Sequence, residues 1–188
     1  MVEKKFIQSE EFYLDSLRLG RIVLDSGYRP DFLVGLWRGG STPGINVQEF
    51  LAYHGVKTDH IAIRTRRYSE SEIDTATEKV EVYGLQYIIE RAQANSKVLF
   101  VDDVYDTGLT LQAVVEELKT RTANAVHDLK IATVYYKPRR NKTSRKPDFY
   151  IHETDAWLVF PHEFQGLTLD EIKEGKGEEV AKHFKRRP

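Results

Sequence analysis

Two short apolar runs limit the possible folds of this chain more than any other feature of the sequence. Each run is followed by a glycine-containing turn and a helical pattern. They span residues 32–36 and 98–101, and turn-forming residues bound each of them. Such runs are typical of strands that are buried on both faces of a parallel sheet. We therefore expect an α/β protein with a doubly wound, mainly parallel sheet flanked by helices, which binds ligands at the carboxyl ends of its strands.

Amphipathic patterns predict the helices around this sheet. Ser9 can cap a helix that Gly27 ends, with Leu14, Leu17 and Leu24 on one face. Further helices are expected at 43–55, 85–92 and 111–118, and further strands at 61–64 and 131–136.

Several stretches fit this alternation less well. Residues 65–80 are polar and too long for an ordinary connection, so we expect a flexible functional loop or a partly disordered segment. Residues 138–147 form a basic loop, 149–160 resemble two short strands, and a helix can begin after Thr168. With 188 residues, the chain suits an α/β core over 1–148 and a small lobe with a tail over 149–188.

The composition excludes several classes of protein. The absence of cysteine excludes disulfide scaffolds, thiolate zinc sites and cysteine nucleophiles. A net charge of -1 creates no overall field that would attract nucleic acid or anionic lipid. Because the chain starts without an apolar segment and has no run of about 18 apolar residues, we expect a cytoplasmic protein with no membrane partner.

The clearest chemical signal lies where the second apolar run ends. Asp102 and Asp103 follow the run, Asp106 comes three residues later, and Thr107-Gly108-x-Thr110 opens a helix. Hydroxyls and unpaired backbone N–H groups at a helix start bind phosphate. Adjacent carboxylates beside a phosphate need a cation or sugar hydroxyls, which points to a phosphorylated sugar with Mg²⁺. The alternative interpretation is an aspartate that caps a helix after a turn.

This window resembles the motif that binds 5-phosphoribosyl 1-pyrophosphate (PRPP) in type I phosphoribosyltransferases. The resemblance implies that Asp102 and Asp103 hold the ribose hydroxyls and the metal, and that Asp106 is the catalytic group near N7 of the base. The residues implied to hold the 5′-phosphate are Thr107, Gly108 and Thr110.

The exit of the first apolar run supports the same family. Arg38 offers a planar fork for phosphate oxygens, and Gly39-Gly40 allows close backbone approach ahead of another helix. By resemblance, Arg38 and Gly39 bind pyrophosphate, and the segment 65–80 is the loop that closes over the reacting centre.

The C-terminal third resembles the purine branch of the family, the hypoxanthine and xanthine-guanine enzymes, with its small C-terminal hood. Lys137 matches the lysine that recognises the 6-oxo group, Trp157 the aromatic that stacks on the base, and Leu158 the residue whose backbone contacts the base edge. Glu163 matches an acidic position near the second metal, which it would reach directly or through water. The alternatives are that Trp157 is a core residue and Lys137 an ordinary surface lysine.

The resemblance therefore implies an enzyme of purine salvage, a pentosyltransferase. It would combine PRPP with a 6-oxopurine and release a nucleoside 5′-monophosphate and pyrophosphate, with Mg²⁺ as cofactor. Hypoxanthine is the favoured base, followed by guanine and xanthine. Members of this family also lead us to expect a homo-oligomer, either a dimer or a tetramer.

Two other functions stay open. Basic clusters at 64–67, 137–146 and 185–187 could belong to a non-catalytic regulator that senses PRPP or a nucleotide and binds nucleic acid. We do not expect a nucleic-acid partner, because such clusters are usually solvated and no aromatic stripe accompanies them. A pyrimidine phosphoribosyltransferase is the other alternative, and Lys137 with Trp157 argues against it.

Overall fold

A computed structural model describes residues 4–69, 78–123, 125–126 and 128–184 of the chain. It divides into two compact units: a larger one of residues 15–155, and a smaller one of residues 1–14 together with 156–188. The larger unit contains a six-stranded sheet and the smaller one a two-stranded sheet.

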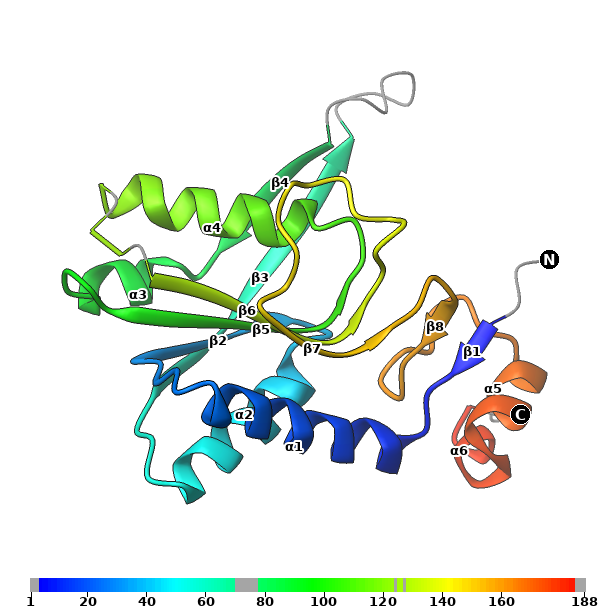
Figure 1. Cartoon of the computed structure of the whole chain (residues 1–188). Helices are drawn as coiled ribbons and strands as arrows, with labels where there is room; N and C mark the ends of the chain where they lie inside the picture. The colour runs from blue at the N-terminus through cyan, green and yellow to red at the C-terminus, as the bar shows by residue number, and fades with distance from the viewer. Residues whose placement is uncertain (1–3, 70–77, 124, 127, 185–188) are drawn as a thin grey trace. The chain divides into compact units, whose positions relative to one another are not determined.

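The larger unit is built on a mainly parallel sheet with the strand order β4-β3-β2-β5-β6-β7 (Figure 1). Only the pair β3–β4 is antiparallel among these described strands. The strands are β2 (Phe32–Trp37), β3 (Asp59–Ser69), β4 (Glu78–Tyr83), β5 (Lys97–Tyr105), β6 (Asp128–Tyr136) and β7 (Phe149–Glu153). The doubly wound, mainly parallel sheet that the sequence predicts is confirmed.

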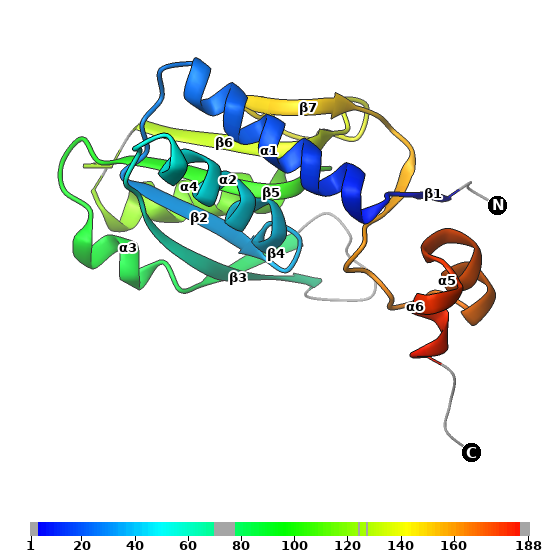
Figure 2. The same ribbon diagram turned by 90° about the horizontal axis from the view of Figure 1, so that it is seen from below.

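Helices cover both faces of this sheet. α2 (Ser41–Tyr53) and the part of α1 (Ser9–Asp25) from Asp15 onward lie on one face, while α3 (Gln86–Arg91) and α4 (Leu109–Arg121) lie on the other (Figures 1 and 2). The central strands carry the core, because Val34 on β2, Phe100 on β5 and Ile131 on β6 are fully buried. Since β2, β5 and β6 run parallel, their carboxyl ends meet at one edge of the sheet.

The buried face of α1 differs from the predicted one. Leu14 was expected inside but is 43% exposed, whereas Leu19 and Val23 are fully buried. The buried face also includes Asp15, whose carboxylate accepts from Arg18 at 2.8 Å and lies 2.7 Å from Nε2 of His152 on β7. These partners satisfy the buried carboxylate. Leu17 and Leu24 are half-buried, so the leucines mark only the edge of the buried face.

The polar segment 65–80 is more regular than its composition suggests. Residues up to Ser69 continue β3, and β4 begins at Glu78, so the two strands form an antiparallel pair. Residues 70–77, at the centre of the expected closing loop, lie outside the described residues. Val80 and Val82 alternate with charged residues, which is a strand signal, but the polar composition of 65–80 favours a loop and hides it.

The smaller unit brings the two ends of the chain together. β1 (Lys4–Phe6) pairs in parallel with β8 (Trp157–Val159), and the helices α5 (Leu169–Lys176) and α6 (Glu178–Lys182) follow. Thr168 caps α5 as expected, in a capping box with Glu171. The predicted division at residue 148 stays a prediction, although β7 pairs with β6 in the larger unit.

No helix in the described part of the chain is both long and apolar enough to cross a membrane.

Candidate active site

A cavity of about 190 Å³ lies where β5 ends and α4 begins. Its lining includes the three aspartates of the predicted motif and the three residues predicted to hold the 5′-phosphate; the set is Asp102, Asp103, Asp106, Thr107, Gly108 and Thr110. The buried centre of β5 fixes the position of its polar end, since Val98 to Val101 are fully buried. The sequence window that suggested a phosphorylated sugar therefore forms one concave surface.

The start of α4 is shaped for an anion. Gly108 is its N-cap residue and adopts a left-handed conformation, with φ of 78°. The first backbone N–H groups of a helix have no partner within the helix, and the helix dipole places partial positive charge there. Thr107 is buried at this point, and Thr110 lies in the first turn of the helix. The arrangement suits a phosphate group.

The turn after β2 lies beside this cavity. A Cβ added to Gly39 would overlap the carboxylate of Asp103, and one added to Gly40 would overlap the carbonyl oxygen of Val101. Glycine is therefore required at both positions for the turn to approach β5. The two glycine-containing loops lie on adjacent strand ends, as the sequence predicts, and the exposed Arg38 belongs to the same turn.

Two cations flank the carboxylate of Asp106. Nζ of Lys137, at the end of β6, is 3.5 Å from Oδ2, and Nε of Arg140 is 2.5 Å from Oδ1. The side chain of Lys137 is only 10% exposed, so it is not an ordinary surface lysine. Hydrogen bonding to Asp106 raises the pKa of Arg140 above its usual value, and the guanidinium stays charged. The sequence indicates only that Arg140 belongs to a basic cluster.

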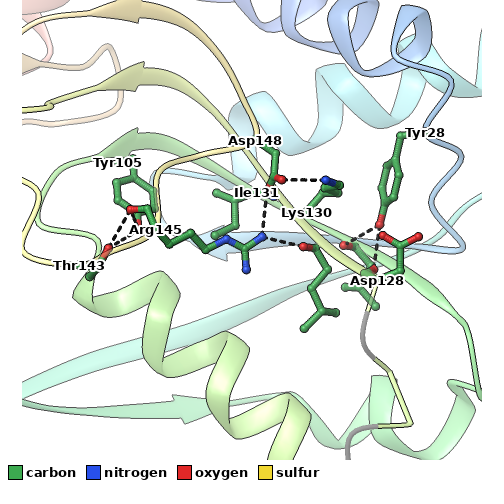
Figure 3. Close-up of polar contacts among 10 residues, drawn as sticks. Tyr28, Tyr105, Asp128, Lys130, Ile131, Thr143, Arg145 and Asp148 are labelled. Carbon is green, nitrogen blue, oxygen red and sulfur yellow. Dashed lines mark hydrogen bonds and ion pairs between the residues drawn. The ribbon is translucent and has the colours of Figure 1, made fainter.

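A network of hydrogen bonds anchors the loop that follows β6 (Figure 3). The hydroxyl of the buried Tyr105 is 2.9 Å from Oγ1 of Thr143 and donates to the carbonyl oxygen of Arg145 at 3.1 Å. Arg145 in turn donates to Asp148 at 2.8 Å. Burial raises the pKa of Tyr105, so its hydroxyl remains a donor. The sequence pattern alone does not indicate this role of Tyr105.

Several charges of this basic loop are neutralised within the larger unit. Besides Arg140, Arg139 pairs with Asp155 at 3.5 Å, and Arg145 pairs with Asp148. Arg139 nevertheless stays 88% exposed, so this pairing does not shield its charge from an anionic partner.

The remaining predicted site residues belong to the smaller unit. Trp157 is 56% exposed on β8, and the neighbouring Leu158 is buried. Oε2 of Glu163 accepts a hydrogen bond from the backbone N–H of Phe160 at 3.0 Å, so this carboxylate stabilises its own turn. The roles of these residues toward a base or a metal stay predictions.

The donors in the cavity are of the type that Mg²⁺ prefers. Asp102 and Asp103 supply carboxylate oxygens, which are hard ligands, and Mg²⁺ commonly uses one or two carboxylates together with substrate oxygens. The carboxylates of Asp102 and Asp103 are therefore suitable ligands for Mg²⁺.

Comparison of the sequence with known proteins finds relatives over most of the chain. The family model of the phosphoribosyl transferase domain matches residues 8–171. The chain is 30% identical over 172 residues to the hypoxanthine-guanine phosphoribosyltransferase of Lactococcus lactis, covering 90% of this chain and 84% of that protein. It is 24% identical over 192 residues to xanthine phosphoribosyltransferase 1 of Saccharomyces cerevisiae. That match covers 88% of this chain and 92% of the yeast protein.

A solved structure shows the same similarity in three dimensions. The crystal structure of a purine phosphoribosyltransferase from Pyrococcus horikoshii matches with a TM-score of 0.67 and 27% identity. The match covers 88% of this chain and 97% of that one.

Proposed function

The chain belongs to the phosphoribosyl transferase family, and from this premise we propose that it transfers the 5-phosphoribosyl group of PRPP to a 6-oxopurine. One observation carries the proposal most directly. The acidic end of β5, the N-terminus of α4 and Asp106 line one cavity, and Lys137 lies beside Asp106. The relatives described above are named as phosphoribosyltransferases of xanthine, of hypoxanthine and guanine, or of purines.

The phosphate groups of PRPP would bind at two places. Thr107, Gly108 and Thr110 would hold the 5′-phosphate with hydroxyls and backbone N–H groups. Arg38 and Gly39, in the turn beside Asp103, would bind the pyrophosphate that leaves.

The carboxylates of Asp102 and Asp103 would hold the ribose. They accept hydrogen bonds from its hydroxyls and stabilise the positive charge that develops at C1′ as the bond to pyrophosphate breaks. Mg²⁺, when bound, would neutralise part of the pyrophosphate charge, held by Asp102, Asp103 and, directly or through water, Glu163.

The base would be recognised by charge and by stacking. The ammonium of Lys137 donates to the 6-oxo group, Trp157 stacks on the ring, and the backbone of Leu158 contacts the base edge. As a ring nitrogen attacks C1′, Asp106 accepts or shares the proton at N7. We expect hypoxanthine to be preferred, then guanine and xanthine, and the dimer or tetramer expected from the family stays a prediction.

A pyrophosphate-release assay tests the proposal. PRPP, Mg²⁺ and the protein would be combined with hypoxanthine, guanine, xanthine, adenine, uracil or orotate. We expect release with 6-oxopurines and little with adenine or the pyrimidines. No release with any base would exclude the proposed transfer, whereas activity restricted to uracil or orotate would favour the pyrimidine alternative.

The variant Asp106→Asn tests the catalytic assignment. The amide keeps the size of the carboxylate but cannot accept a proton, so kcat should fall by about 10² to 10⁴ while PRPP still binds. Asp155→Asn is the control, because Asp155 pairs with Arg139 outside the cavity. An unchanged turnover number in Asp106→Asn would remove Asp106 from the mechanism.

A further inference from the structure

The loop after β6 contacts the chain on both sides of Asp106. The backbone N–H of Lys137 donates to the carbonyl oxygen of Tyr105 at 2.9 Å, and that of Lys142 donates to the carbonyl oxygen of Thr107 at 2.9 Å. Tyr105 and Thr107 are the two neighbours of Asp106 in the sequence. The backbone on either side of the proposed catalytic carboxylate is therefore tied to one loop.

The turn between these two anchors is itself fixed. The N–H groups of Arg140 and Asn141 both donate to the carbonyl oxygen of Lys137 at 3.2 Å. The side-chain amide of Asn141 donates to the carbonyl oxygen of Arg145 at 2.8 Å and accepts from the N–H of Thr143 at 2.9 Å. Arg140 thus leaves the backbone from a defined position, and less conformational entropy is lost when its side chain pairs.

The two adjacent arginines of this turn have different partners. Nε of Arg140 lies 2.5 Å from Oδ1 of Asp106, whereas Nε of Arg139 lies 3.5 Å from Asp155. The side chain of Arg139 is 88% exposed, compared with 56% for Arg140. Arg140 therefore makes a direct hydrogen bond to Asp106 from a less exposed position, whereas Arg139 makes a looser pair at the surface.

The pairing distinguishes the two oxygens of Asp106. Arg140 holds Oδ1, and Oδ2 is the oxygen that lies 3.5 Å from Nζ of Lys137. Nζ donates to Oδ2 in this structure, so an acceptor and a donor lie side by side. A 6-oxopurine protonated at N7 presents the matching pair on one edge, because N7 and the 6-oxo group are adjacent. An aminopurine presents a donor at position 6 instead and meets the ammonium unfavourably.

We propose that Arg140 is a positioning residue for Asp106: by holding Oδ1, it turns Oδ2 toward the base beside Lys137. This inference rests on the proposed function, since it assigns a task to the carboxylate of the same site. Arg140 acts through Asp106 and not on PRPP. Its loss should therefore affect turnover far more than the binding of PRPP.

Three variants test the inference in the pyrophosphate-release assay with hypoxanthine. Arg140→Met should lower kcat about tenfold, the effect of losing one charge-assisted hydrogen bond, with the KM for PRPP changed by less than about twofold. Arg140→Lys keeps the charge and should recover part of the loss. Arg139→Met, the matched control on the neighbouring residue, should leave kcat within about twofold of the wild type.

A double-mutant cycle separates positioning from a general structural role. In the Asp106→Asn background, where the charged pair no longer exists, Arg140→Met should cost less than about twofold in kcat. If Arg140→Met lowers kcat by the same factor in both backgrounds, or no more than Arg139→Met does, Arg140 does not act through Asp106. If the wild-type protein releases no pyrophosphate with any base, the proposed function is wrong, and this inference is wrong with it.

Discussion

At the scale of single residues, Gly108 carries two separate constraints. Its φ of +78° lies in the left-handed region that residues with a side chain rarely adopt. In addition, a Cβ at this position would lie 2.5 Å from the ring and 2.6 Å from the hydroxyl oxygen of Tyr105. Because Tyr105 is buried and bonded to the loop after β6, it cannot move aside freely. The turn that we propose for the phosphate is thus packed against Tyr105, whose hydroxyl is bonded to the loop after β6.

We predict that Gly108→Ala raises the KM for PRPP by about tenfold or more and lowers stability by about 1–3 kcal/mol, since it adds both strain and overlap. Gly55→Ala is the matched control. Gly55 has nearly the same φ, +80°, but nothing within 4 Å of an added Cβ. Steady-state kinetics and thermal unfolding measure the two effects. Equal losses of stability in both variants would show that the Tyr105 contact adds nothing to the strain.

Lys137 is the residue that most directly tests the base pocket. Its side chain is nearly buried beside Asp106, and methionine fills a similar volume without a charge. We predict that Lys137→Met raises the KM for hypoxanthine about 10- to 100-fold, the cost of a lost charged hydrogen bond, and leaves PRPP binding within about twofold. Lys146→Met, at an exposed position of the same loop, is the control. Unchanged use of hypoxanthine by Lys137→Met would show that the base binds elsewhere.

At the scale of elements, the sequence predicts those strands and motifs whose residues are neighbours in the chain. The strands β2 and β5 and the motif from Asp102 to Thr110 are continuous in the chain, so burial and spacing indicate them directly. The strand β1 has only three residues and β4 is rich in charged residues, and both rest on partners that the pattern does not identify. The contact of Arg140 with Asp106 joins residues 34 positions apart, and only the path of the loop after β6 brings them together.

The end of the same loop depends on Asp148. Its carboxylate accepts from Lys130 at 2.9 Å, from Arg145 at 2.8 Å and from the backbone N–H of Ile131 at 2.9 Å. Burial would raise the pKa of Asp148, but these hydrogen bonds outweigh it and lower the pKa below the usual 3.8. A carboxyl whose pKa is lower in the folded state stabilises the fold above its unfolded pKa and loses that effect as pH falls through its folded value.

We therefore predict that Asp148→Asn lowers the free energy of unfolding by about 1–2 kcal/mol near neutral pH. The difference from the wild type should shrink as the pH falls below about 4, because the wild-type carboxyl then becomes protonated. Urea unfolding across this pH range measures both effects, with Asp155→Asn as the control for a single surface pair. A difference that stays constant down to about pH 2 would show that the charge of Asp148 does not cause the stabilisation.

At the scale of the whole molecule, the first residues of the chain organise the strand that carries the predicted base contacts. β1 pairs with β8 in the register Lys4↔Trp157 to Phe6↔Val159, and the N–H of Ile7 donates to the carbonyl oxygen of Val159 at 3.0 Å. Ile7 is only 3% exposed. Two segments about 150 residues apart thus build one small unit. The order around Trp157 and Leu158 depends on residues that precede α1.

This dependence predicts that the two substrates respond differently to one core substitution. Ile7→Ala should destabilise the smaller unit by about 2–4 kcal/mol through a cavity, raise the KM for hypoxanthine and leave the KM for PRPP nearly unchanged. Hydrogen exchange should accelerate at 157–160 but not at 98–101. Ile88→Ala, a matched truncation of a fully buried residue in the larger unit, is the control and should not loosen 157–160 selectively. If Ile7→Ala speeds exchange at 157–160 while hypoxanthine use stays normal, Trp157 and Leu158 do not hold the base.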